Sequence, residues 1–188
     1  MKIYILLAHP DKNTLNGAFA DAYETAALQK GHEVRRQNLG EMQFDPILWQ
    51  GYKTIQELEP DLKTAQENIL WCQHWVILYP IWWGAMPALL KGFFDRALYS
   101  GFAYKYHQND PLWDKLLKGR SGQIITTSDA PWWWIYFGYR NSDLNAVKRA
   151  TFQFCGINPV RVTRFSRVRW SDEKRRLQWI EQVKRSVI

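Results

Sequence analysis

Cysteine is scarce in this chain, which has only Cys72 and Cys155 among its 188 residues. Two cysteines are too few for a disulfide framework, and their positions lack the paired spacing of a metal site. No apolar run approaches the roughly 18 residues that a membrane span needs, and the run at the N-terminus is too short for a secretory leader. We therefore expect a reduced, cytoplasmic protein with no integral membrane segment.

Glycine-rich phosphate motifs are also missing. The 11 glycines form neither G-x-G-x-x-G nor G-x-x-x-x-G-K-[ST], and the G-x-S-x-G turn of serine hydrolases does not occur. The 4 histidines have no partner at i,i+4 spacing, so no metal site is expected. A nucleotide-like cofactor is therefore a better source of reactivity than a side-chain nucleophile.

Positive charge and tryptophan are abundant instead. The chain has 25 Lys and Arg against 18 Asp and Glu, a net charge of +7. This balance is typical of proteins that bind nucleic acid, an anionic membrane face or an anionic ligand, and of proteins that are merely soluble and basic. The 11 tryptophans include groups at 82–83 and 132–134, which either cap the core or form a platform for a flat ligand.

The order of apolar and amphipathic segments predicts the fold. Continuous apolar runs favour strands buried on both faces, and apolar residues at helical spacing favour helices. Strands are expected over 2–8, 32–39, 75–80, 121–128 and 159–168, and helices over 14–30, 60–74, 86–98, 142–156 and 171–187, the last with Ser171 as its N-cap. This alternation predicts a single α/β domain over residues 1–188, a doubly wound five-stranded parallel sheet of order 2-1-3-4-5 with helices on both faces.

Three loops of this fold should meet at one site. In the order 2-1-3-4-5, ligands bind beyond the carboxyl ends of the strands, where the direction of winding changes. The loops at 9–16, 80–87 and 127–140 are therefore expected to converge.

The first loop has the composition of a phosphate site. His9, Asn13, Thr14 and Asn16 surround the start of the first helix, where unpaired backbone N–H groups attract anions. Asparagine tolerates a left-handed backbone and can replace glycine in a tight loop. The alternative is that Thr14 is only an N-cap and His9 only a loop residue.

The other two loops are rich in aromatic residues. In the second, Gly84 allows close approach of a ligand, and Trp82 and Trp83 offer planar faces, although one of them is expected to plug the end of the sheet. The third loop carries a dense aromatic stretch at 132–139, which marks a binding groove or a subunit interface.

Taken together, these segments resemble the flavodoxin-like NAD(P)H:quinone oxidoreductases, the diaphorase and modulator-of-drug-activity B group. The resemblance covers nearly the whole chain and rests on LAHPDKNTLN after the first strand, PIWWGAMPALLKGFFDR at 80–96, FAYKY at 102–106 and FCGI at 154–157. It implies a flavodoxin-like fold, a homodimer, and hydride transfer from NAD(P)H through a bound flavin to a quinone or similar small electrophile, in ping-pong order.

The resemblance also implies which residues hold the flavin. FMN is favoured over FAD because the chain is short. The residues implied are His9, Asn13, Thr14, Leu15 and Asn16 for the phosphate, Pro80, Ile81, Trp82, Trp83 and Gly84 for the ring, and Thr127, Ser128 and Asp129 along the ring edge. The family usually has T-T-G-G at 126–129, whereas this chain has Thr-Thr-Ser-Asp, which brings a carboxylate toward the flavin unless Asp129 turns away. Tyr136 and Tyr139 are candidates for a proton relay or for the substrate pocket.

Three alternatives remain at this level. The protein could be a flavodoxin-type electron carrier, although such carriers are typically acidic, or a flavin-binding regulatory subunit peripheral to a potassium-efflux transporter. Nucleic-acid binding is disfavoured, because the basic residues of the C-terminal part are more simply explained as solvated faces of a strand and a helix: Arg161, Arg164, Arg167, Arg169, Lys174, Arg175 and Arg176.

Overall fold

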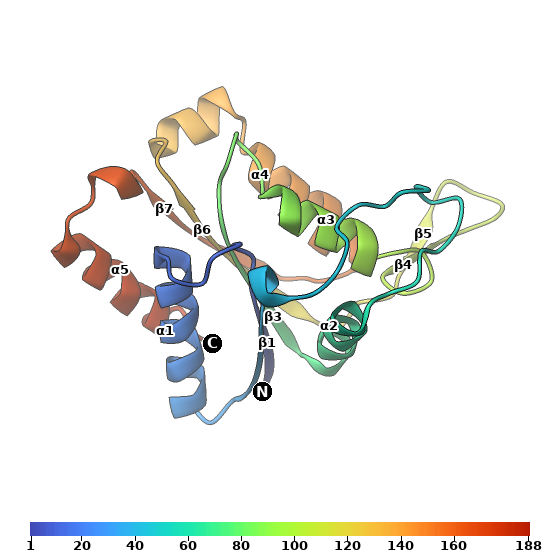
Figure 1. The fold of residues 1–188 in the computed structure, drawn as a ribbon, viewed down its shortest axis with the longest axis horizontal. Helices are drawn as coiled ribbons and strands as arrows, with labels where there is room; N and C mark the ends of the chain where they lie inside the picture. The colour runs from blue at the N-terminus through green and yellow to red at the C-terminus, as the bar shows by residue number, and fades with distance from the viewer.

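The computed structural model describes all residues, 1–188, and contains one central parallel sheet of five strands (Figure 1). The strand order is β2-β1-β3-β6-β7, which is the predicted order 2-1-3-4-5. The strands are β1 (Lys2–Leu7), β2 (Glu33–Asn38), β3 (His74–Pro80), β6 (Ser121–Ser128) and β7 (Val160–Ser166). The predicted fold class is therefore confirmed.

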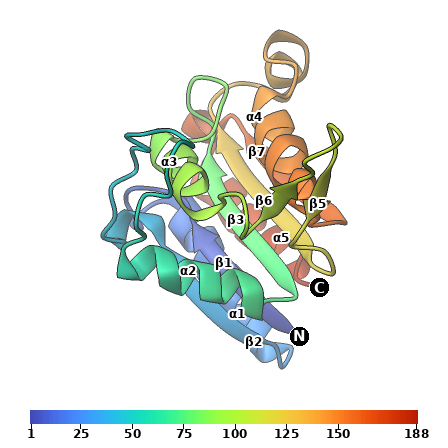
Figure 2. The ribbon, with the colours of Figure 1, turned by 90° about the vertical axis from the view of Figure 1, so that its right-hand side faces the viewer.

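Helices cover both faces of the sheet (Figures 1 and 2). On one face lie α1 (Leu15–Gln29) and α5 (Glu173–Arg185), and the rings of Phe19 and Phe165 pack 4.7 Å apart beneath them. On the other face lie α2 (Pro60–Trp71), α3 (Ala88–Ala97) and α4 (Ser142–Leu144), the last continued by the π-helical segment η3 (Asn145–Gln153). There Trp75 stacks on Phe152 at 4.8 Å. None of the helices is both long and apolar enough to span a bilayer.

Several predicted boundaries were wrong by a few residues. The second helix ends at Trp71, and His74 belongs to β3. The N-cap of α5 is Asp172 and not Ser171, because the Asp172 carboxylate accepts a hydrogen bond from the backbone N–H of Arg175 at 2.8 Å. Gly31 and Gly156, which follow the helices that begin near residues 14 and 142, have the positive φ that is common just past the end of a helix.

The segment 99–119, between α3 and β6, contains a β-hairpin that we did not predict from the sequence. Its strands β4 (Tyr104–Tyr106) and β5 (Trp113–Lys115) pair antiparallel and project away from the sheet (Figure 1). Trp113 anchors the hairpin by stacking on Phe154 at 4.5 Å. Three short turns complete the chain, η1 (Leu39–Glu41), η2 (Trp134–Gly138) and η4 (Val168–Trp170).

Candidate functional site

A cleft of about 350 Å³ lies at the carboxyl edge of the sheet, where the three loops converge as predicted. Twelve of the thirteen residues expected to bind the cofactor line it, and Tyr139 does so as well. Asn13 is exposed and lies outside the lining, as does Tyr136. The complete lining is His9, Thr14, Leu15, Asn16, Pro80, Ile81, Trp82, Trp83, Gly84, Thr127, Ser128, Asp129, Ala130, Tyr139 and Val168.

The first turn of α1 offers free donors to this cleft. Thr14 is the N-cap, and its Oγ1 accepts the backbone N–H of Gly17 at 3.3 Å. The backbone N–H groups of Leu15 and Asn16 donate to no protein atom. The Asn16 side chain is buried, and its Nδ2 donates to Thr127 Oγ1 at 2.8 Å while its Oδ1 has no partner. A buried acceptor beside free N–H groups indicates a ligand that has both anionic and hydroxyl groups.

His9 is oriented by the same loop. Its Nδ1 accepts the backbone N–H of Asp11 at 2.9 Å, so the neutral ring carries its proton on Nε2 and can donate from that atom. The ring also makes an edge contact with Trp82, with the ring centroids 5.5 Å apart.

The first loop contains no glycine, but its backbone packs against two glycines outside it, Gly17 and Gly40. None of residues 9–16 has a positive φ, so the expected left-handed asparagine was wrong. Instead, a Cβ on Gly17 would lie 1.8 Å from the carbonyl oxygen of Lys12, and one on Gly40 would lie 1.9 Å from that of Pro10. The loop backbone therefore passes directly over α1 on one side and over η1 on the other.

The second loop is a tight hairpin closed by two backbone hydrogen bonds of 2.9 Å between Trp82 and Ala85. Its central residues Trp83 and Gly84 have φ of 52° and 71°, as a type I′ turn requires. A left-handed backbone is common for glycine but strained for tryptophan. The Trp83 side chain is also fully exposed. Neither packing in the core nor backbone preference therefore explains why a tryptophan stands at this position.

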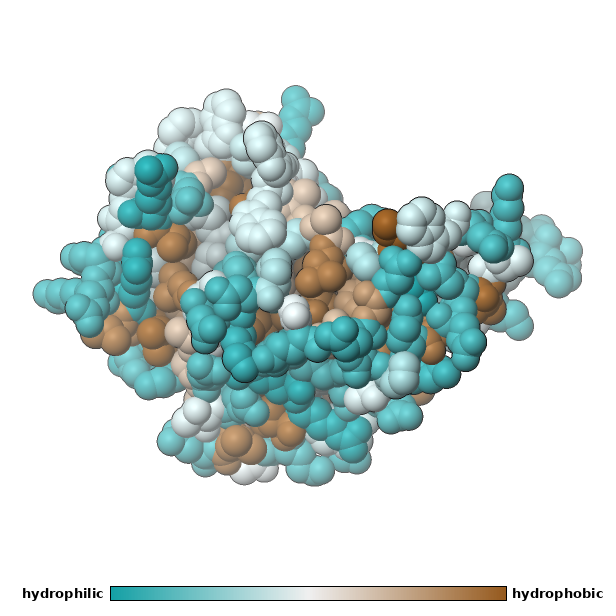
Figure 3. All heavy atoms as spheres, in the orientation of Figure 1, coloured by the Kyte–Doolittle hydropathy of each residue, from teal (hydrophilic) through white to brown (hydrophobic).

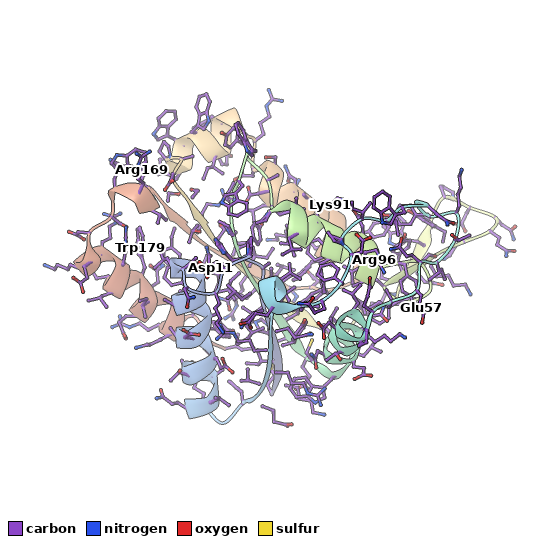
Figure 4. The ribbon with its side chains drawn as sticks, viewed as in Figure 1. Asp11, Glu57, Lys91, Arg96, Arg169 and Trp179 are labelled. Carbon is purple, nitrogen blue, oxygen red and sulfur yellow. The ribbon has the colours of Figure 1, made fainter.

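Side chains at the start of the third loop hydrogen-bond to backbone groups of the loop itself and of η4. Ser128 is buried, and its hydroxyl donates to the carbonyl oxygen of Ala130 at 3.0 Å. Asp129 Oδ1 accepts the backbone N–H of Arg169 at 2.8 Å. Arg169 belongs to η4, between β7 and α5 (Figure 4). The Asp129 carboxylate is thus fixed at the edge of the cleft.

The aromatic stretch of this loop lies beside the cleft and is solvent-exposed. Its pale side chains form the top of the molecule in Figure 3. The exposed members are Trp132, Trp133, Trp134, Tyr136, Phe137 and Tyr139. Only Tyr139 reaches the cleft, where its ring packs so closely that a Cβ on Gly84 would lie 3.1 Å from it.

Two lining residues, Ala130 and Val168, were not expected from the sequence. Val168 follows β7, whose carboxyl end lies at the same edge as those of β3 and β6. The same rule that selected the other three loops therefore pointed to this one.

The comparisons with known proteins agree with this geometry. Residues 1–187 match the family described as having a flavodoxin-like fold. The chain belongs to that family. It is 31% identical over 188 residues to an NAD(P)H oxidoreductase of Haemophilus influenzae, a match that covers 96% of this chain and 91% of the relative. It is 29% identical to NAD(P)H dehydrogenase [quinone] 1 of Cavia porcellus over 81% of this chain, but spans only 64% of that relative.

Solved structures show the same fold. Smu.1420 from Streptococcus mutans superposes with a TM-score of 0.84 at 28% identity, over 98% of this chain and 97% of that one. An FMN-dependent NADH-azoreductase from Bacillus anthracis, solved in complex with FMN, has a TM-score of 0.71 at 21% identity, over 98% of this chain and 96% of that one. The family and the oxidoreductase class that the motifs predicted are confirmed.

Proposed function

We propose that the protein binds FMN in the cleft and uses it to transfer hydride from NAD(P)H to a quinone or a similar small electrophile. The observation that carries this proposal is the pairing of free Leu15 and Asn16 N–H groups with the buried, unpartnered Asn16 Oδ1. A flavin phosphate and its sugar-alcohol chain supply an anion for the donors and a hydroxyl for the acceptor. The relatives named as NAD(P)H dehydrogenases and oxidoreductases support the reaction class.

Different residues around the cleft are assigned to the phosphate and to the ring of the cofactor. Thr14, the Leu15 and Asn16 N–H groups and His9 Nε2 hold the phosphate, while the exposed Asn13 side chain stays outside. The turn at Pro80–Gly84 and the strand end at Thr127–Asp129 would hold the ring, and the exposed Trp83 indole would be available to cover it. When bound, the flavin supplies the chemistry, accepting hydride from NAD(P)H and passing it to the second substrate in ping-pong order. FAD remains the alternative cofactor.

The protein itself provides position and an exposed platform for the substrates. Of the two candidate tyrosines, only Tyr139 lines the cleft, and we assign it to the substrate pocket. Tyr136 is assigned to the aromatic surface. We assign this surface, made by Trp132, Trp133, Trp134, Tyr136 and Phe137, to the contact between two copies of the chain, because exposed aromatic patches of this kind mark interfaces. Sedimentation equilibrium tests the homodimer.

The first test is the visible spectrum of the protein with FMN, before and after NADPH is added without oxygen. A bound flavin band that bleaches supports the proposal. A bound flavin that stays oxidised indicates an electron carrier or a regulatory subunit, and failure to take up FMN or FAD rules out the cofactor site.

A matched pair of variants tests the hydrogen bond between the Asn16 side chain and the sugar-alcohol chain of the flavin. Asn16→Ala removes a side chain that lines the cleft, whereas Asn13→Ala removes one beside it. We expect Asn16→Ala to weaken FMN binding about tenfold and Asn13→Ala to change it less than twofold, as expected for loss of one or two hydrogen bonds to a ligand. Equal effects would contradict the assignment.

A further inference from the structure

Backbone strain is concentrated around the cleft. Four residues other than glycine have a left-handed backbone: Trp83, Arg140, Asn141 and Arg167. Trp83 lines the cleft, the Arg140–Asn141 pair follows Tyr139, and Arg167 precedes Val168. Strained conformations persist only where the surrounding structure holds them, and they cluster at functional sites.

A buried ion pair holds the Arg140–Asn141 turn. Arg164 extends from β7, and its Nη1 donates to Asn141 Oδ1 at 2.9 Å. Its Nη2 donates to both oxygens of Asp143, at 3.0 and 2.8 Å. The Asp143 side chain has no exposed surface. The expectation that Arg164 belongs to a solvated face was therefore wrong.

The same turn is joined to the Trp83 turn. Ser142 lies between Asn141 and Asp143 in sequence, and its hydroxyl donates to the carbonyl oxygen of Gly84. The Tyr139 ring also packs against Gly84. A chain of contacts thus runs from the Arg164–Asp143 pair through Ser142 to Gly84, and so to Trp83.

Near these turns, strands β3, β6 and β7 carry buried polar side chains. In the register of the sheet, Tyr79 lies opposite Thr126, which lies opposite Arg164. Tyr79 Oη, Thr126 Oγ1 and Arg164 Nε are all buried without a partner. Buried ion pairs contribute little net stability compared with apolar residues of similar volume, so their use here calls for another reason.

We propose that Arg164 and Asp143 are positioning residues, which act through Ser142 to hold Trp83 and Tyr139 in place at the cleft. Arg164 suits this role because its planar guanidinium can bind the Asp143 carboxylate and the Asn141 side chain at the same time. The consequence for flavin affinity rests on the proposed function, but the mechanical link between the two turns does not.

The test uses Ser142→Ala, which removes the linking hydroxyl and leaves the buried pair intact. The control is Ser186→Ala, at the C-cap of α5 and away from the cleft. The Ser186 hydroxyl also donates to a backbone carbonyl, that of Val183 at 2.7 Å, and it accepts a further hydrogen bond from Gln123 Nε2 at 2.9 Å. Hydrogen exchange is measured on the ligand-free protein at the Ala85 N–H, which closes the turn on the carbonyl oxygen of Trp82. The Ile77 N–H in β3 reports global unfolding.

We expect Ser142→Ala to speed exchange at Ala85 and to weaken FMN binding about fivefold each, with no such changes in Ser186→Ala. Exchange at Ile77 measures the change in global stability that each variant causes. Arg164→Lys keeps the positive charge but cannot bind Asn141 and Asp143 at the same time. It should therefore also speed hydrogen exchange at the Ala85 N–H. Unchanged exchange at Ala85 in Ser142→Ala overturns the link. Faster exchange with unchanged FMN affinity overturns the positioning role. If the wild-type protein binds no flavin, the proposed function fails, and the exchange result alone decides whether the two turns are linked.

Discussion

Asp129 and Arg169 are joined across the edge of the cleft, where Asp129 Oδ1 accepts the backbone N–H of Arg169 at 2.8 Å. The bond explains how a carboxylate can stand where the resemblance to the family led us to expect glycine. The side chain is held by η4, and it still lines the cleft. A negative charge is therefore fixed beside the proposed position of the ring.

This charge should lower the reduction potential of the bound flavin, because reduction adds negative charge nearby. Asp129→Asn keeps an oxygen acceptor for the Arg169 N–H but removes the charge. An interaction of roughly 1 kcal/mol between two partly solvated charges corresponds to about 20 mV for two electrons. We expect the potential to rise by about that amount in an anaerobic titration against redox dyes.

The control for this experiment is Asp172→Asn. The Asp172 carboxylate also accepts a backbone N–H at 2.8 Å, that of Arg175, but it does not line the cleft. Its removal should leave the potential unchanged. An equal potential in Asp129→Asn and wild type would show that the carboxylate is too far from the ring, or too well solvated, to matter.

Trp83 is expected to lower the free energy of unfolding and to strengthen FMN binding. Its φ of 52° costs of order 1 kcal/mol or more for a residue with a side chain and little for glycine. Trp83→Gly is therefore expected to raise the free energy of unfolding by about 1 kcal/mol in urea titrations. Because the exposed indole is proposed to cover the flavin, the same change should weaken FMN binding about tenfold.

Trp83→Ala separates these two effects. Alanine keeps the backbone strain but loses the ring, so FMN binding should weaken without the gain in stability. A Trp83→Gly variant that binds FMN as tightly as wild type would mean that the indole covers no part of the ligand.

Much of the fold was accessible from the sequence because its signals are local. Continuous apolar runs such as 75–80 predict strands buried on both faces, and β3 contains that run. Five strand–helix repeats then leave few possible orders. Three of the loops at the cleft followed from that order, since parallel strands end at a common edge.

The parts that were missed depend on contacts between distant segments. The role of Gly40 depends on Pro10, which lies 30 residues earlier in the chain. Arg164 was expected to be solvated because nothing in its own strand indicates that Asp143 will be buried against it. The β4–β5 hairpin has strands of three residues each, too short for a periodic signal.

Gly17 offers a direct test of how the first loop is supported. A methyl group there would collide with the Lys12 carbonyl oxygen, so Gly17→Ala must displace the loop. Overpacking of this kind costs about 1–3 kcal/mol, and we expect a loss of that size in urea unfolding together with at least tenfold weaker FMN binding. Ala18→Gly, on the same helical turn, is the control: it should lower stability by about 1 kcal/mol without a tenfold loss of FMN binding. Normal FMN affinity in Gly17→Ala would show that the loop geometry does not control the phosphate.

His74 should make stability depend on pH at the opposite end of the sheet. Its side chain is 1% exposed, and its Nδ1 lies 2.7 Å from Ser121 Oγ while its Nε2 has no partner. Burial, reinforced by Arg161, lowers the pKa of His74 from its usual 6.5 to about 4. The unfolded chain therefore binds a proton between pH 6.5 and 4 that the folded protein does not.

The sign of the effect follows from that difference. Stability attributable to the neutral His74 is complete above pH 6.5 and is lost as the pH falls toward 4, by about 3 kcal/mol in total. Carboxylates also titrate in this range, so the informative quantity is the difference between wild type and His74→Asn in urea unfolding at several pH values. We expect the two stability curves to converge as the solution is acidified from pH 7 to 4. Parallel curves would mean that His74 is protonated as readily in the folded protein as in the unfolded chain.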